Sequence, residues 1–205
     1  MRKLLCALCA LCLLLAGCAG GEAADELTAV FFNVGKADAI LLYNGEMAVL
    51  IDAGENGDGK DVAEALCQNT SFTLGGCEFS IDVANRDDYG EDEENDFSLV
   101  VRLTHGEVRF LFAGDAENAR LAELLDEGDL SSDVLKVPHH GRYADLSAAF
   151  FAVVSPQYAV ITSDEDDPED PETVRALEAA GAQVLFTREG TVTLVSDGEG
   201  VRAAQ

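Results

Sequence analysis

LKVPHHGRYADL, which spans Leu135 to Leu146, joins an apolar run to two adjacent histidines, His139 and His140, followed by Gly141. A short apolar run that ends at a proline and a glycine is typical of a buried strand. A strand that delivers paired imidazoles to its end indicates a metal site or a catalytic base, because imidazole serves in both roles. The chain has one other histidine, His105, so other side chains must complete any such site.

The composition is that of a globular protein with one domain. The chain has 205 residues and is 48% hydrophobic, which suffices for a sizeable core. Its formal net charge is −26. A field of this sign repels phosphate backbones and attracts cations, whereas nucleic-acid-binding proteins are usually basic. A nucleic-acid partner is therefore disfavoured unless a bound metal or a small local patch mediates the contact.

The first 17 residues have the pattern of a secretory signal peptide. Two basic residues precede the apolar run Leu4–Leu15, which is short for a membrane span. The following LAGC, Leu15 to Cys18, resembles the lipobox of bacterial lipoproteins. That resemblance implies cleavage before Cys18, lipidation of its sulfur, and a protein that is exported and lipid-anchored to the membrane at the bacterial cell surface. The alternative is an ordinary signal peptide with a chance cysteine.

The expected cleavage and lipidation also determine how many cysteines are available to form disulfides. Three of the six cysteines leave with residues 1–17, and Cys18 takes the lipid. Only Cys67 and Cys77 remain, and these two either pair in an exported protein or are separate core thiols. Residues 18–26 form a lipid-attached tether, and residues 27–205 form the folded domain.

The pattern within the domain changes near residue 116, from strands alone to alternating helices and strands. This order predicts an α/β fold with a β-rich first part. His105 and Gly106 mark a hairpin turn, and His105 is expected at its exposed tip. The expected strands cover 27–35, 38–45, 47–54, 71–76, 77–85, two arms within 97–115, 133–137, 158–163, 182–188 and a last run at 191–198; the expected helices cover 60–68, 116–128, 146–154 and 171–181.

Two acidic runs stand out from this pattern. Asp87–Asp96 contains seven acids in ten residues and is expected as an exposed loop, because such dense like charge resists burial. The second run is Asp164–Glu172. Carboxylates of this kind either solvate a surface or bind Ca²⁺ or Mg²⁺. The loop at Gly54–Glu64 lacks the ligand spacing of a calcium-binding loop and is expected to be a plain turn-rich connection.

Five phrases of the chain, in order, resemble the metallo-β-lactamase-type domain of the competence protein ComEC. The resemblance implies an αββα sandwich of the metallo-β-lactamase type, with a site at the strand ends that holds zinc or manganese and hydrolyses phosphodiesters. The matching phrases are FFNVGKADAILL, AVLIDAGENGDG, NDFSLVVRL, FLFAGDAE and SDVLKVPHHG.

The same resemblance assigns the site residues. It implies that Asp115, His139 and His140 are metal ligands and catalytic residues, and it adds Asp52 and Asp38 as further metal-site carboxylates. Each is expected at the same edge of a sheet, where strand ends hold ligands rigidly.

The chain also departs from the family. The family's H-x-H-x-D-H motif is absent, and the sequence between Leu66 and Ser71 has no room for the strand that carries it. A later histidine-containing phrase is replaced by DDPEDPE, in which Asp166, Asp167 and Asp170 are candidate substitutes. We therefore expect a partly truncated sandwich, with a sheet edge after residue 68 that is either exposed or covered by another chain.

Hydrolytic metal sites need three protein ligands and an open position for water. We accordingly expect a protein of the metallohydrolase lineage whose hydrolysis is impaired and which holds, at most, one Zn or Mn ion weakly. Two alternatives remain at this point: a non-catalytic surface binding module, and an acidic surface protein that binds divalent cations.

Overall fold

The computed structural model describes residues 26–33, 38–44, 47–53, 70–74, 76–86, 89 and 94–204. The expected signal peptide, Cys18, almost all of the tether and the expected helix at 60–68 lie outside these residues. None of the helices that are described is long and apolar enough to cross a membrane.

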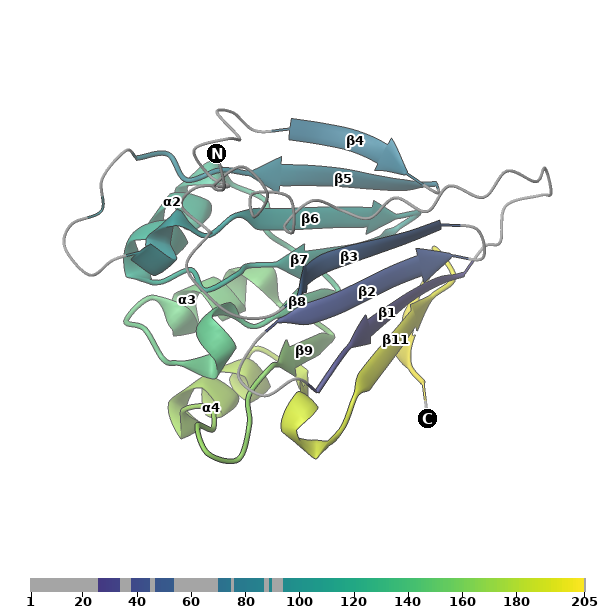
Figure 1. The fold of residues 1–205 in the computed structure, drawn as a ribbon. Coiled ribbons are helices and arrows are strands. Elements are labelled where there is room, and N and C mark those ends of the chain that lie inside the picture. Colours follow the sequence, from purple (N-terminus) through teal and green to yellow (C-terminus); the bar gives the residue numbers. More distant parts are fainter. Residues whose placement is uncertain are drawn as a thin grey trace, which may run out of the picture.

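Two β-sheets pack face to face (Figure 1). The five-stranded sheet is antiparallel throughout, as the pairings of neighbouring strands show. Its order across the sheet is β12 (Val201–Ala203), β11 (Val192–Ser196), β1 (Leu27–Phe31), β2 (Ala39–Asn44) and β3 (Met47–Ala53).

The second sheet has seven strands and mixed directions. The pairs β7–β8, β8–β9 and β9–β10 are parallel. The pairs β4–β5, β5–β6 and β6–β7 are antiparallel. Its order is β10 (Gln183–Phe186), β9 (Tyr158–Ile161), β8 (Val134–Lys136), β7 (Val108–Phe112), β6 (Val100–His105), β5 (Cys77–Asp82) and β4 (Thr70–Leu74).

Three helices cover the outer face of the seven-stranded sheet (Figure 1): α2 (Asn118–Glu127), α3 (Ser147–Val154) and α4 (Pro171–Ala179). Each lies in a connection between parallel strands, as the right-handed crossover rule favours. Short 3₁₀ turns are η1 (Glu94–Phe97), η2 (Pro138–Gly141) and η3 (Thr187–Glu189).

Two hydrophobic layers hold this arrangement together. Phe31, Ile40 and Phe110 belong to the layer between the sheets. Leu121 and Phe150 belong to the layer between the seven-stranded sheet and the helices. Because β7, β8 and β9 are buried on both faces, they read as continuous apolar runs. The α/β class and the face-to-face sheets predicted from the sequence are confirmed.

One edge strand of each sheet adjoins, in the sequence, the segment 54–69. β3 is the last strand of one sheet and β4 is the last strand of the other. The residues that join them, 54–69, lie outside the described part of the chain, and so does the loop at Gly54–Glu64. The expectation of an edge strand after residue 68 agrees with the position of β4.

The prediction that His105 lies at an exposed hairpin tip is wrong. His105 is 9% exposed, and its Nδ1 lies 3.1 Å from Ser196 Oγ. The cover comes from the turn after β11, where Gly198 accepts a hydrogen bond from the backbone N–H of Glu107 at 2.6 Å. The run at 191–198 is therefore not the last strand, since β12 follows it and completes this turn.

The expected exposed loop at Asp87–Asp96 is also wrong at its end. Asp96 is 2% exposed, and its Oδ1 accepts hydrogen bonds from the backbone N–H groups of Glu117 and Arg120 at 3.0 and 2.8 Å. These N–H groups belong to the first turn of α2, which lacks intrahelical acceptors and carries partial positive charge. A carboxylate from a distant segment therefore caps the helix.

Candidate functional site

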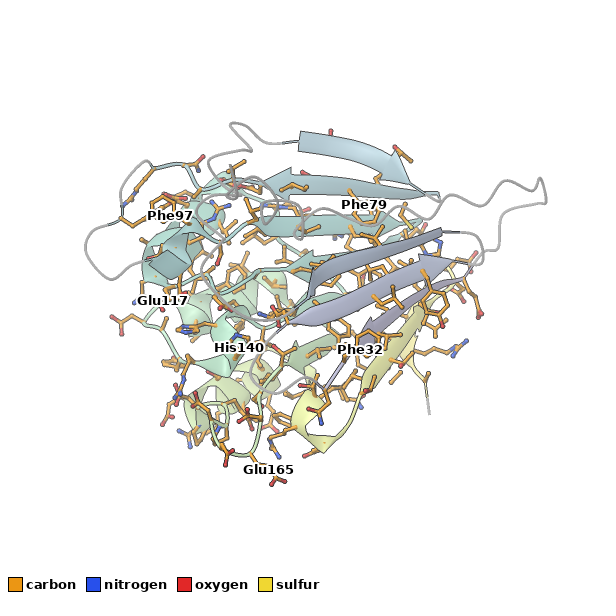
Figure 2. The ribbon with its side chains drawn as sticks, in the orientation of Figure 1. Phe32, Phe79, Phe97, Glu117, His140 and Glu165 are labelled. Carbon is orange, nitrogen blue, oxygen red and sulfur yellow. The ribbon has the colours of Figure 1, made fainter. Side chains whose placement is uncertain are left out.

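The candidate site lies where three parallel strands end. Asp115 follows β7, the paired histidines follow β8, and Thr162 follows β9. Carboxyl ends of neighbouring parallel strands meet at one edge of a sheet, which is the usual place for a site in α/β proteins. His140 and Glu117, labelled in Figure 2, belong to this edge.

A strained turn sets the direction of both histidines. They lie in η2 rather than on β8, and both have left-handed backbones, with φ of 46° at His139 and 51° at His140. The backbone N–H of His139 donates to Gly114 O at 3.1 Å, which fixes the turn on the end of β7. Non-glycine residues adopt this conformation at a cost, and such positions concentrate at functional sites.

His140 has its two ring nitrogens in different surroundings. Nδ1 lies 2.9 Å from the carbonyl oxygen of Thr162, which can only accept, so we assign the proton to Nδ1. Nε2 faces Asp115 Oδ1 at 3.3 Å, and it must carry a proton as well to donate to this carboxylate, whereas a metal ion would bind Nε2 without that proton. Histidines that ligate metals are usually oriented in this way, by donating the second ring N–H to a carbonyl. Asp115 and His140 are therefore brought together as predicted.

Asp115 is held ionised at the end of β7. Its backbone N–H donates to Ser98 Oγ at 2.9 Å, which gives a role to the serine of the phrase NDFSLVVRL. Burial alone raises the pKa of Asp115, but the hydrogen bond from His140 and the charge of Lys136 outweigh burial and hold the pKa well below its usual range.

His139 takes a different partner. Its Nδ1 lies 3.0 Å from Glu117 Oε1, and Asn95 Nδ2 donates to the same oxygen at 2.8 Å. The two histidine rings are 6.4 Å apart between centroids. Sequence reasoning missed Glu117, although its place two residues after Asp115 was a usable signal. His139 therefore forms a separate pair beside the Asp115–His140 pair.

Asp38 reaches the site from the five-stranded sheet, yet it binds a lysine. Its Oδ2 lies 2.6 Å from Lys136 Nζ, and its Oδ1 accepts a hydrogen bond from Thr162 Oγ1 at 2.7 Å. The ammonium group also donates to Gly114 O at 2.9 Å. Lys136 and Thr162 had no part in the predicted site, although a lysine inside an apolar strand run is an unusual feature of a sequence.

The acidic run after β9 turns toward arginines. Arg142 forms ion pairs with Asp167 and with Asp170, and Tyr143 N–H donates to Asp170 Oδ2 at 2.8 Å. Asp166 contributes its backbone N–H to Asp164 within the loop. These contacts engage Asp167 and Asp170 with Arg142, next to the histidine turn.

The described residues do not fit the metal centre that the resemblance implies. In the described part of the chain, no group of three His, Cys, Asp or Glu side chains is placed to hold a metal ion. Asp115 and His140 supply two ligands, one fewer than a hydrolytic site needs. Asp52 is the last residue but one of β3, and its side chain lies outside the described residues.

Comparisons with known proteins agree with the fold. No family model matches the chain. A 73-residue segment is 36% identical to the competence protein ComA of Neisseria gonorrhoeae, and it covers 35% of this chain and 11% of that protein. The metallo-β-lactamase fold protein YhfI from Bacillus subtilis superposes with a TM-score of 0.53 at 8% identity, over 87% of this chain and 100% of that one.

The sheets, the helix layer and the strand-end site thus define a protein of the metallo-β-lactamase fold. Within that class, the similarity to ComA supports a ComEC-like domain, over about a third of the chain.

Proposed function

We propose that this chain is an exported, lipid-anchored protein of the ComEC-like metallohydrolase lineage, with impaired hydrolysis of phosphodiesters and nucleic acids. Asp115 and His140 would hold at most one zinc or manganese ion, and only weakly. The observation that carries the proposal is this pair, which has metal-ligand orientation but lacks a third protein ligand among the described residues.

The position of His105 supports the proposal that hydrolysis is impaired. His105 ends β6, whose antiparallel pairing with β7 puts it opposite the start of β7, at Val108. Asp115 follows the other end of β7. With His105 at the wrong end of the sheet, the chain has no histidine left to replace the family's H-x-H-x-D-H ligands. Zinc activates water with three protein ligands and an open position, which this set does not reach.

A non-catalytic surface binding module is the second candidate. The observation in its favour is that Asp38 contacts both Lys136 and Thr162 beside the site. Their contacts keep the two sheets joined there. In that case the partner is a molecule other than a polyanion, since the net charge of −26 repels phosphate backbones.

Hydrolysis of bis(p-nitrophenyl) phosphate in the presence of Zn²⁺ or Mn²⁺ tests the proposal. We expect the wild-type protein to be no faster than Asp115→Asn, because the pair cannot activate water efficiently. Asp129→Asn is the matched control, since Asp129 is exposed and pairs with Arg109 before β8 begins. Rapid turnover that Asp115→Asn abolishes, and that Asp129→Asn leaves intact, would contradict impairment.

A further inference from the structure

We propose that the ammonium group of Lys136 is the resident cation of this site, joining carboxylates from both sheets where the fold would otherwise use metal ions. The proposal deepens the proposed function, because it depends on the incomplete ligand set. It also explains how the strand ends stay together without that set.

The strand pattern sends Lys136 into the interior. Side chains alternate across a strand, and Val134 belongs to the layer between the sheets, whereas Leu135 belongs to the layer under the helices. Lys136 therefore shares the inward face with Val134. It pairs with Phe112 on one side and Val160 on the other, and it is 0% exposed. A buried ammonium is costly unless it is fully paired.

The three acceptors around Lys136 Nζ match its three N–H donors. Asp38 Oδ2 lies at 2.6 Å, Gly114 O at 2.9 Å and Asp115 Oδ1 at 3.5 Å. Asp38 precedes β2 of the five-stranded sheet, whereas Gly114 and Asp115 follow β7 of the seven-stranded sheet. One cation therefore bridges the two sheets, which is what a metal ion with ligands from both would do.

The contacts close into a ring. From Lys136 the ring passes to Asp38, then to Thr162 through its hydroxyl at 2.7 Å, and then to His140 Nδ1 at 3.1 Å from that hydroxyl. His140 Nε2 leads to Asp115, and Asp115 leads back to Lys136. Every member has a partner on each side, so the ring orders the site with the chain's own groups.

Lys136 also affects metal binding, because its ammonium group already lies against an oxygen of Asp115. A metal ion between Asp115 and His140 would share the Asp115 oxygen with this positive charge. Like charges at such distances repel, so Lys136 both replaces a metal and weakens its binding.

Thermal unfolding of the mature chain tests the proposal, with Lys136→Met as the variant because methionine retains an unbranched apolar stem. We expect the wild-type Tm to be the same in chelator, Zn²⁺ and Mn²⁺. The Tm of Lys136→Met should fall by roughly 6–20 °C in chelator, since it leaves buried carboxylates unpaired. Zn²⁺ or Mn²⁺ should then recover at least half of the loss. Arg175→Met, which removes an exposed cation, should show neither effect.

A double variant keeps the test decisive. Asp38→Asn/Lys136→Met removes one buried carboxylate together with the ammonium, and we expect a higher Tm than that of Lys136→Met alone. If Lys136→Met does not fold, cooperative melting of the double variant supports the proposal, and failure of both variants to fold would overturn it.

A Lys136→Met variant that melts like the wild type would also overturn the proposal. So would one whose lost stability is recovered neither by metal nor by Asp38→Asn. The experiment measures stability and not turnover. Phosphodiester turnover by the wild type would therefore contradict the proposed function without deciding the role of Lys136.

Discussion

At the scale of single residues, a second buried charge organises the side of the domain away from Lys136. The Arg120 guanidinium is 0% exposed and lies 2.7 Å from Asp82 Oδ1 and 3.0 Å from Glu123 Oε2. Glu123 also accepts a hydrogen bond from Tyr89 at 2.8 Å. Burial lowers the pKa of Arg120, but these two carboxylates outweigh it and raise the pKa. Arg120 therefore ties α2 to the end of β5.

Arg120→Met should destabilise the domain by about 3–5 kcal/mol, because it removes the buried cation between Asp82 and Glu123 and leaves them only the more exposed Arg102 and Arg86 as ion-pair partners. Urea denaturation followed by circular dichroism measures the loss. Arg175→Met is the control, since the Arg175–Glu172 pair is exposed and should contribute less than about 1 kcal/mol. Equal losses in the two variants would show that Arg120 is not a structural hub.

The sequence allowed part of this residue-scale picture to be predicted. The sequence predicted that Asp115, His140 and Asp38 share one sheet edge. Asp115 and His140 follow neighbouring strands of the seven-stranded sheet, whereas Asp38 approaches from the start of β2 in the other sheet. Lys136 and Arg120 were beyond prediction, since a charge inside an apolar pattern shows no partner until tertiary contacts supply one. Asp96 was misplaced for the same reason, because the N–H groups that donate to it lie at the start of a helix 21 or more residues away.

At the scale of elements, the turn η2 carries the site and packs against the acidic connection between β9 and α4. Gly141 has φ of 85°. Its carbonyl oxygen accepts a hydrogen bond from the backbone N–H of Asp170 at 3.0 Å. A Cβ atom at Gly141 would lie 2.6 Å from Glu169 Cβ. The turn therefore needs glycine both for its backbone and for this close approach.

Gly141→Ala should destabilise the domain by about 2–5 kcal/mol, as the sum of left-handed strain and overpacking. Gly181→Ala isolates the strain, since Gly181 has φ of 92° with open space around it, and should cost about 1–2 kcal/mol. Chemical denaturation of both variants measures the difference. A Gly141→Ala loss no larger than that of Gly181→Ala would remove the packing argument.

Glu169 gives this connection a defined pH dependence. Burial raises its pKa, but hydrogen bonds from Arg188 and Ser163 outweigh burial and lower the pKa below its ordinary value of 4.5. A lowered folded pKa means that the stabilisation is present above pH 4.5 and is lost as the pH falls further. Glu169→Gln should cost about 1.5–3 kcal/mol at neutral pH. The gap to the wild type should close in acid, and a gap that stays constant in denaturation curves down to pH 3 would contradict this.

Element prediction succeeded where the sequence pattern is a clear local signal. The amphipathic pattern of α2 and the apolar runs of β7 and β9 are such signals, and all three elements were predicted. β12 has only three residues, Val201–Ala203, which is too short a run to show alternation. Missing β12 also misplaced His105, because the turn that buries His105 joins β11 to β12.

At the scale of the whole molecule, the domain has the sheets of a metallo-β-lactamase fold, but its described residues do not complete a metal centre. The helix expected at 60–68 lies outside the described residues. Cys67 lies there too, so a disulfide with Cys77 and two separate core thiols both stay as alternatives from the sequence; burial raises the pKa of the Cys77 thiol to about 11. Membrane anchoring through Cys18 is likewise part of the proposal.

Cys18→Ser should shift the protein from the membrane fraction to the soluble exported fraction, because lipid chains on the sulfur supply the anchoring free energy. Cys77→Ser is the control and should stay with the membrane. Cell fractionation with immunoblotting provides the measurement. A Cys18→Ser protein that remains with the membrane would exclude this cysteine as the anchor.

Metal content of the natively purified protein tests the central claim most directly. The incomplete set around Asp115 and His140 predicts at most one equivalent of zinc or manganese by elemental mass spectrometry, which dialysis against buffer removes. Two equivalents that survive dialysis would show that the chain assembles a full two-metal centre and would contradict the account.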